Sequence, residues 1–221
     1  MRARRLLYLN AHQMTAHLWR GGQLAGEGTF AATEAGCRQF TDYLRRNQQS
    51  RFSLLVNVAQ ESFQIESIPY LRGADRRAVI ERKLSQLFFN ATLTASRSLG
   101  YEKSRRKDER VLLAALPDNA FFAPWLKAIT DSGADLAGIH SLPLLAAALL
   151  KKLAITDGHC LLLTIQDQSI RQSYYANGEL RFSRLTPLQN SSIGGIAQSL
   201  SAEAAKLQQY LSSQRMIDPG D

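Results

Sequence analysis

The chain carries the same local order of elements twice, and this repeat constrains the fold more than any single motif. Each copy has three short segments of strand type followed by an amphipathic helix. The strand segments of the first copy are Leu6–Asn10, Met14–Trp19 and Gln23–Phe30; those of the second are Cys160–Gln166, Ile170–Ala176 and Glu179–Leu185. Gly21-Gly22 and Asn177-Gly178 separate the second and third strands, as tight hairpins with positive φ require. The pattern predicts an α/β fold with mixed sheets, built on a duplicated β-β-β-α unit.

The first copy continues with a helix over Glu34–Gln48, for which Thr33 is the predicted N-cap. A continuous apolar run over Phe52–Val58 predicts a strand buried on both faces. Further on, Ser141 is expected to cap a buried helix that includes Leu142–Leu150. This apolar stretch is far below the roughly 20 residues that a membrane span needs.

The region between residues 61 and 133 shows a different order of strands and helices from the two copies. It predicts a small β-α-β-β-α insert, whose elements are Glu61–Ile68, Asp75–Phe89, Ser96–Lys103, Arg110–Leu116 and Asp118–Ser132. Gly133 fits the stop of the last helix. We therefore expect residues 1–60 and 134–155 to form a first subdomain. Residues 61–133 would form an inserted interaction subdomain, and residues 156–221 a partial second subdomain.

Composition excludes several classes of protein. The 221 residues carry a net charge of +8, which permits contact with nucleic acid or anionic lipid without demonstrating either. Cys37 and Cys160 have no CxxC spacing, so a zinc site or a disulfide scaffold is not expected, and a reducing compartment fits. The basic start is followed by an apolar run too short for a signal peptide.

The order of elements resembles the actin-like superfamily, in particular the PilM-like cytoplasmic proteins of type IV pilus and type II secretion inner-membrane platforms. The segment Cys160–Pro187, with Phe182-Ser183-Arg184 after its Asn-Gly turn, resembles the second phosphate hairpin of that family. Ala202–Tyr210 resembles the helix that follows it. The resemblance implies duplicated ribonuclease H-like units, with the insert at 61–133 as interaction subdomain. It also implies an incomplete second lobe, since the family continues with more sheet after this helix.

The family opens each phosphate hairpin with Asp-x-Gly, and this sequence departs from that motif in both copies. The first copy reads Asn10-Ala11-His12, and the second reads Thr164-Ile165-Gln166. Neither an amide nor a hydroxyl supplies the negative charge that Mg²⁺ prefers. Asp167 is nearby, but strand alternation is expected to point it away. The sequence therefore predicts a degenerate nucleotide site without catalytic residues or metal ligands, in which ATP-Mg is disfavoured.

Two further groups of residues are candidate sites. The pair Gly194 and Gly195, before a helix, could form a phosphate-cradling turn, although a simple loop is the commoner meaning of such a pair. Basic residues in the insert form a candidate partner-binding surface: Arg76, Arg77, Lys103, Arg105 and Arg106. A solvated face, an acidic protein partner, lipid headgroups and nucleic acid all remain open for this surface.

The first hypothesis is a non-catalytic actin-like scaffold in a type IV pilus-like or secretion inner-membrane platform. It would be cytoplasmic, peripheral at the inner membrane, and bound to a protein component of the platform. The second hypothesis is an ATP-binding switch in which Asn10 and Thr164 act through a water-held metal. The third is a charge-driven nucleic-acid binder, whose affinity would fall steeply with salt.

Overall fold

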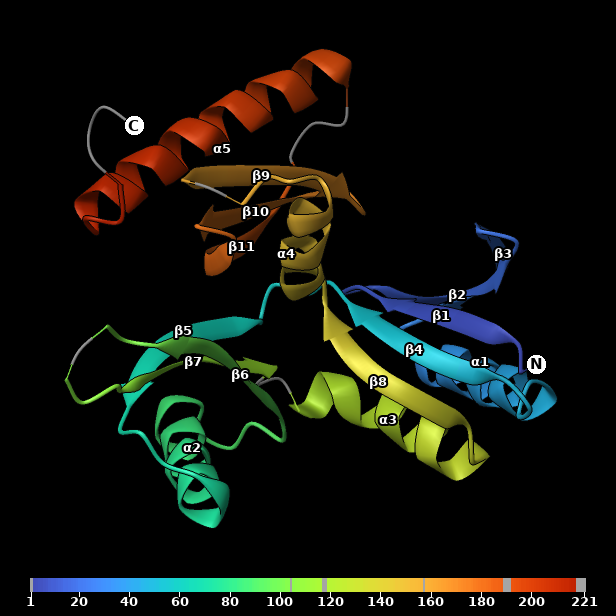
Figure 1. Ribbon diagram of the computed structural model, residues 1–221. Helices are drawn as coiled ribbons and strands as arrows, with labels where there is room; N and C mark the ends of the chain where they lie inside the picture. Colours follow the sequence, from blue (N-terminus) through green and yellow to red (C-terminus); the bar gives the residue numbers. More distant parts are fainter. Residues whose placement is uncertain (1, 104, 117–118, 157, 189–191, 218–221) are drawn as a thin grey trace. The chain divides into compact units, whose positions relative to one another are not determined.

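A computed structural model describes residues 2–103, 105–116, 119–156, 158–188 and 192–217 (Figure 1). The predicted helix start at Asp118 lies outside this part, as does Ser104. The chain divides into two compact units. The first comprises Met1–Ser62, Leu71–Ser96 and Ala114–Leu145; the second comprises Phe63–Tyr70, Arg97–Leu113 and Ala146–Asp221.

A five-stranded sheet dominates the first unit. Its order is β3 (Gln23–Ala31), β2 (Gln13–Arg20), β1 (Arg4–Leu9), β4 (Arg51–Val56) and β8 (Asp135–Ser141). β1 runs antiparallel to β2 and parallel to β4, and β4 runs parallel to β8. The predicted duplicate strands and the mixed sheet are therefore confirmed in this unit.

Two helices, α1 (Glu34–Arg46) and α3 (Asn119–Ser132), lie along one side of this sheet (Figure 1). The alternate residues Leu7 and Leu9 of β1 are fully buried against them, as expected for a strand with one covered face. The ring of Phe40 in α1 lies 5.3 Å from that of Phe30 and 5.4 Å from that of Trp125. These aromatic contacts form the centre of the first core.

Local sequence signals set the ends of these helices. The Thr33 hydroxyl accepts a hydrogen bond from the Gly36 amide at 3.1 Å, so the predicted N-cap of α1 is confirmed. A Cβ at Gly36 would lie 2.0 Å from the Ala31 carbonyl oxygen, and only glycine fits there. Gly133 has φ +65° and ends α3 as predicted.

The insert contains the predicted elements, but its last helix packs elsewhere. A three-stranded sheet has the order β5 (Ser62–Ile68), β7 (Glu109–Leu116) and β6 (Leu93–Tyr101), and α2 (Gly73–Leu87) lies between β5 and β6 in sequence. The buried side chains of α3, Phe122, Trp125 and Ile129, belong to the core that α1 covers. The division of the chain at residue 133 stays a prediction, while the packing of α3 associates it with the five-stranded sheet.

The second unit repeats the antiparallel part of the first. β9 (His159–Gln166), β10 (Ser169–Ala176) and β11 (Glu179–Pro187) form a sheet with β10 in the middle. Helix α5 (Ile193–Ser213) packs on it, with Leu207 and Leu211 against Tyr174. Asn177 and Gly178 have φ +53° and +73°, so the predicted Asn-Gly turn is confirmed.

Helix α4 (Leu142–Lys152) differs from the prediction in two respects. Leu150 is buried, but Leu145 and Leu149 are 42% and 51% exposed, so the prediction of a buried helix is wrong for one side. Ser141 ends strand β8, and its hydroxyl has no hydrogen-bond partner among the described residues, so the predicted cap is not formed. None of the described helices is long and apolar enough to cross a membrane.

Candidate nucleotide site

The first predicted phosphate turn joins β1 to β2 through Asn10, Ala11, His12 and Gln13. Asn10 is 4% exposed, and its side-chain oxygen accepts hydrogen bonds from the amides of His12 and Gln13, both at 2.9 Å. The Asn10 amide donates to the Gln13 carbonyl at 3.1 Å. This is an Asx-type turn, in which the side chain binds its own backbone. Asn10 therefore shapes the turn, and it occupies amides that would otherwise be available to a phosphate.

The second turn has a similar path but different chemistry. Gln166 pairs with Ser169, and the two central residues, Asp167 and Gln168, have φ +51° and +55°. Both centres are left-handed, as in a type I′ turn, although neither is glycine. Asp167 lies at the turn rather than in a strand, so strand alternation does not decide where its side chain points. It is exposed.

The two turns give the correct equivalence between the copies. Leu9 pairs with Met14 before the first turn, and Ile165 pairs with Ile170 before the second. Asn10 therefore corresponds to Gln166, and Thr164 lies two residues further back, inside β9. The predicted match of Asn10 with Thr164 is wrong by two positions, because β9 continues to Gln166 before the chain turns.

The predicted glycine turn belongs to the first turn of a helix. Gly194 and Gly195 follow Ser192, whose hydroxyl caps α5 by accepting the Gly195 amide at 3.1 Å. A Cβ at Gly194 would meet nothing within 4 Å, so no close approach of another group requires glycine there. The cap uses one of the amides that a phosphate would need.

The donor groups of these turns do not fit a magnesium–nucleotide complex. Mg²⁺ in proteins is held by carboxylates and by substrate phosphates. The first turn offers the side-chain amide of Asn10 and the exposed imidazole of His12. The second turn offers the carboxylate of Asp167. Across the described residues there is no group of three or more His, Cys, Asp or Glu side chains that could hold a metal ion. Whether Asn10, His12, Thr164, Gln166, Gly194 and Gly195 bind a nucleotide stays a prediction.

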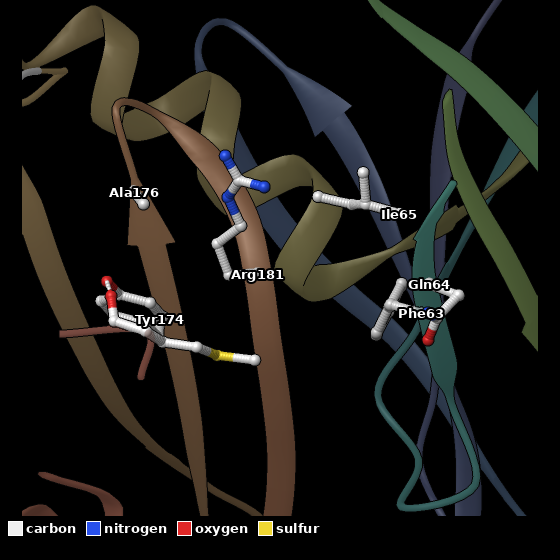
Figure 2. A pocket seen from close by; sticks show the side chains of 7 residues that line it. Phe63, Gln64, Ile65, Tyr174, Ala176 and Arg181 are labelled. Atoms are coloured by element: carbon white, nitrogen blue, oxygen red, sulfur yellow. Dashed lines mark hydrogen bonds between the residues drawn. The ribbon is translucent and has the colours of Figure 1, made fainter. Parts of the chain in front are cut away.

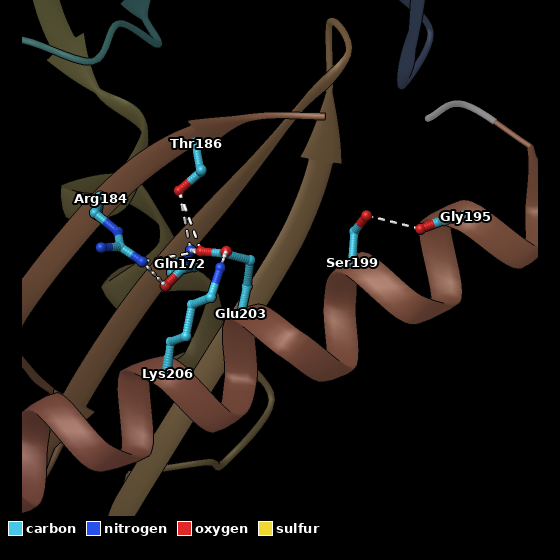
Figure 3. Close-up of polar contacts among 7 residues, drawn as sticks. All are labelled: Gln172, Arg184, Thr186, Gly195, Ser199, Glu203 and Lys206. Atoms are coloured by element: carbon cyan, nitrogen blue, oxygen red, sulfur yellow. Dashed lines mark hydrogen bonds and ion pairs between the residues drawn. The ribbon is translucent and has the colours of Figure 1, made fainter. Parts of the chain in front are cut away.

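The sequence analysis did not predict a buried polar network between helix α5 and the sheet of β9, β10 and β11 (Figure 3). Glu203 of α5 is 7% exposed. Its carboxylate accepts hydrogen bonds from Gln172 at 2.5 Å, from Arg184 at 2.9 Å and from Lys206 at 2.9 Å. The hydrogen bond from Lys206, with those from Gln172 and the charge of Arg184, lowers the pKa of Glu203 against the opposing effect of burial. The sequence did contain a signal of this burial, because Glu203 lies four residues before Leu207 and therefore on the same, inward face of the helix.

A cavity of about 360 Å³ in the second unit contains none of the predicted site residues (Figure 2). It is lined by Phe63, Gln64, Ile65, Tyr174, Ala176, Arg181 and Met216. Arg181 is paired with Glu179 at 2.9 Å, and the Tyr174 hydroxyl donates to the Met216 carbonyl at 3.0 Å. These polar groups are held by neighbours within the protein, so the cavity gives no indication of a charged ligand.

The predicted basic surface divides between the two units. Arg76 and Arg77 lie on α2 in the first unit, while Lys103, Arg105 and Arg106 lie between β6 and β7 in the second. The last three are exposed, as is Lys107 beside them in the sequence. Each group is therefore a separate candidate surface.

Solved structures share this arrangement of elements. The PilM-PilN type IV pilus biogenesis complex matches with a TM-score of 0.63 and 11% identity over 96% of this chain and 77% of that one. A Bacteroides thetaiotaomicron protein of actin-like ATPase fold and unknown function matches with a TM-score of 0.55 and 7% identity, covering 98% of this chain and 78% of the other. The protein has an actin-like ATPase fold. The predicted fold and the predicted resemblance to PilM are thus confirmed.

The cytoplasmic domain of EpsL, an inner-membrane component of the type II secretion system of Vibrio cholerae, also matches. Its TM-score is 0.46 at 13% identity, over 85% of this chain and 72% of that domain. No family model matches the sequence, and no curated protein matches it. At these identities the likeness establishes the actin-like fold, and function must be argued from the residues.

Proposed function

We propose that this protein is a non-catalytic actin-like scaffold that binds a protein component of a type IV pilus-like or secretion platform. It would work in the cytoplasm, at the inner membrane. The observation that carries the proposal is the first turn, where the Asn10 side chain accepts the amides of His12 and Gln13. These contacts turn a phosphate-facing hairpin into a self-contained structural turn.

Binding of a nucleoside triphosphate needs positive charge or aligned amides to offset the phosphate charge. In the first turn, the Asn10 oxygen takes two amides, and there is no carboxylate to hold the metal that would neutralise the phosphates. In the second unit, the Ser192 hydroxyl takes the Gly195 amide at the start of α5. Both parts of phosphate recognition are therefore weakened, and a structural use of the fold is favoured.

Calorimetry with ATP and Mg²⁺ tests the absence of nucleotide chemistry. We expect no saturable heat at millimolar nucleotide. Asp167→Asn is the informative variant, because Asp167 is the carboxylate at the second turn. Tight ATP-Mg binding that Asp167→Asn abolishes would contradict the scaffold and favour the alternative, an ATP-binding switch.

The partner contact is proposed for the insert, in part because PilM is known in a complex with PilN, a second protein of type IV pilus biogenesis. Of the candidate residues Arg76, Arg77, Lys103, Arg105 and Arg106, we assign Arg76 and Arg77 on α2 to the partner. An acidic or polar segment of an inner-membrane platform protein would suit these cations. This assignment remains a proposal, since the likeness to PilM extends to the fold alone.

Complementation of a deletion strain tests the scaffold role. Asp167→Asn is expected to restore pilus assembly or secretion as well as the unaltered protein does, because no nucleotide step is needed. Arg76→Glu/Arg77→Glu is expected to fail while accumulating to the same level. Arg45→Glu/Arg46→Glu, on the exposed side of α1, is the matched control with the same change of net charge. Failure of Asp167→Asn alone would contradict the proposal.

A further inference from the structure

The turn between β6 and β7 combines a dense positive charge with two exposed aromatic rings at one end of a sheet. We propose that this end of the molecule docks on an anionic lipid surface. The cations are Lys103, Arg105, Arg106 and Lys107, named here the basic turn. This inference goes beyond the scaffold function, and it assigns the basic turn to lipid headgroups rather than to the protein partner.

The charges of the basic turn are directed to solvent. All four cations are exposed, and no ion pair involves them among the described residues. Of the neighbouring acids, Glu109 is 2% exposed, within β7. Glu102 accepts a hydrogen bond from the Ser67 hydroxyl at 2.9 Å, and its amide donates to the Asp108 carbonyl at 2.8 Å, closing the turn. The acids therefore lie at the base of the turn and the cations at its end.

Two tyrosines lie at the same end of the sheet. Tyr70 follows β5 and Tyr101 ends β6, and their ring centroids are 5.6 Å apart. Tyr70 is 43% exposed and Tyr101 is 56% exposed. Tyrosine is enriched at membrane–water interfaces, where the ring sits at headgroup level and the hydroxyl stays wet. The rings thus add an apolar contact to the charges of the adjacent basic turn.

The geometry favours a lipid surface over a peptide or a nucleic acid. A peptide is usually gripped by a groove or pocket, and neither the cavity of Figure 2 nor the one beside Gln48 and Ser50 is lined by these residues. Nucleic acid is gripped by rings that stack with bases, whereas Tyr70 and Tyr101 pack on one another. Four cations on a turn can all reach a flat surface of negative headgroups at once.

The expected strength is moderate and depends on salt. Each Lys or Arg near an anionic membrane contributes about a fivefold gain in partitioning at moderate ionic strength. The basic turn would then give reversible attachment, strengthened by any platform protein bound at the same time. Screening by salt should weaken the attachment steeply, because the cations are exposed.

Vesicle co-sedimentation tests the proposal with the full chain. The protein should bind vesicles of phosphatidylcholine and phosphatidylglycerol, and not vesicles of phosphatidylcholine alone. Arg105→Glu/Arg106→Glu should lower the partition coefficient at least about 20-fold. The matched control is Lys151→Glu/Lys152→Glu, at the exposed end of α4, which changes the net charge by the same amount. It should lose far less binding.

A fluorescent variant reports on the rings. Tyr101→Trp should show a blue-shifted emission when anionic vesicles are added, and no shift with neutral ones. Equal loss of binding in the two double variants would overturn the proposal, because it would show a general effect of net charge. Unchanged vesicle binding of Arg105→Glu/Arg106→Glu would also overturn the proposal. If this variant instead lost binding to a platform protein or to duplex DNA, the basic turn would be assigned to that partner. Since the vesicles contain no protein, the outcome is independent of the scaffold function.

Discussion

The two β-β-β-α units have nearly the same backbone plan and very different interiors. β2 spans residues 13–20 and β10 spans 169–176, while β3 spans 23–31 and β11 spans 179–187, so each bound recurs 156 positions later. The amide of residue 32 donates to the carbonyl of residue 12 at 2.8 Å, and that of residue 188 donates to residue 168 at 2.7 Å. The two copies therefore share the lengths of their turns and strands, although their side chains differ.

The interior behind the hairpin is apolar in the first unit and polar in the second. Ala16, Gly28 and Phe30 of the first unit correspond to Gln172, Arg184 and Thr186 of the second. Among the residues that the structure describes, Ala16 and Phe30 belong to a cluster of sixteen buried apolar residues, while the cluster under α5 has three. Gln172, Arg184 and Thr186 instead surround the Glu203 carboxylate. At these three equivalent positions, apolar contacts of the first copy are thus replaced in the second by hydrogen bonds around the Glu203 carboxylate.

The largest expected effect comes from the apolar interior. Phe40→Ala should lower the free energy of unfolding of the first unit by about 3–5 kcal/mol, because it opens a cavity between Phe30 and Trp125. Urea denaturation and hydrogen exchange of β1 and β2 would measure the loss. Phe89→Ala, whose ring is 81% exposed, should change stability by less than about 0.5 kcal/mol. A small effect of Phe40→Ala would mean that the first unit does not depend on its apolar core.

The second unit should respond to charge and to pH. Glu203→Gln should destabilise it by about 1.5–3 kcal/mol at neutral pH, since Arg184 and Lys206 lose a charged acceptor. The pKa of Glu203 is lowered by folding, so its contribution is complete above the unfolded pKa and is lost as pH falls through the folded pKa. The difference between variant and unaltered protein should therefore begin to shrink below the ordinary pKa of a glutamate, about 4.3, and vanish only once the pH falls below the lowered folded pKa.

Glu34→Gln is the control for this prediction, because the Glu34 side chain is 86% exposed and lies on the first unit. It should change the stability far less than Glu203→Gln does. Urea midpoints measured from pH 3 to pH 7 (roughly the range over which carboxylates titrate) separate the cases. A constant difference between Glu203→Gln and the unaltered protein across this range would show that the network does not act through the carboxylate charge.

The first turn should depend on one side chain. Asn10→Ala removes the acceptor of two amides and should cost about 1–2 kcal/mol of stability. Asn10→Asp keeps an oxygen in the same place and should cost less than about 0.5 kcal/mol, since it still accepts both amides. Thermal unfolding of the two variants makes the comparison. Equal losses would show that the side-chain oxygen is not what holds the turn.

Local chemistry made part of this fold predictable from sequence. Gly21-Gly22, Asn177-Gly178 and the Thr33 cap were placed correctly, because each depends on a few neighbouring residues. The turn between Gln166 and Ile170 was predicted, but its left-handed backbone at Asp167 and Gln168 was not, since neither residue is glycine or asparagine. The packing of α3 was also beyond the sequence, because an apolar stripe does not tell which sheet it covers. The Glu203 network could not be predicted, because its partners come from two strands and a helix and meet only through tertiary packing.

The smallest effect concerns backbone strain in the turns. Gln168 has φ +55°, so Gln168→Gly should stabilise the second unit by about 0.5 kcal/mol after the entropy of glycine is included. Gly22 has φ +81° with nothing within 4 Å of its Cβ position, so Gly22→Ala should destabilise the first unit by about 1 kcal/mol through backbone strain alone. Thermal unfolding measures both changes; if Gln168→Gly destabilises as well, the Asp167-Gln168 turn is held by its side chains.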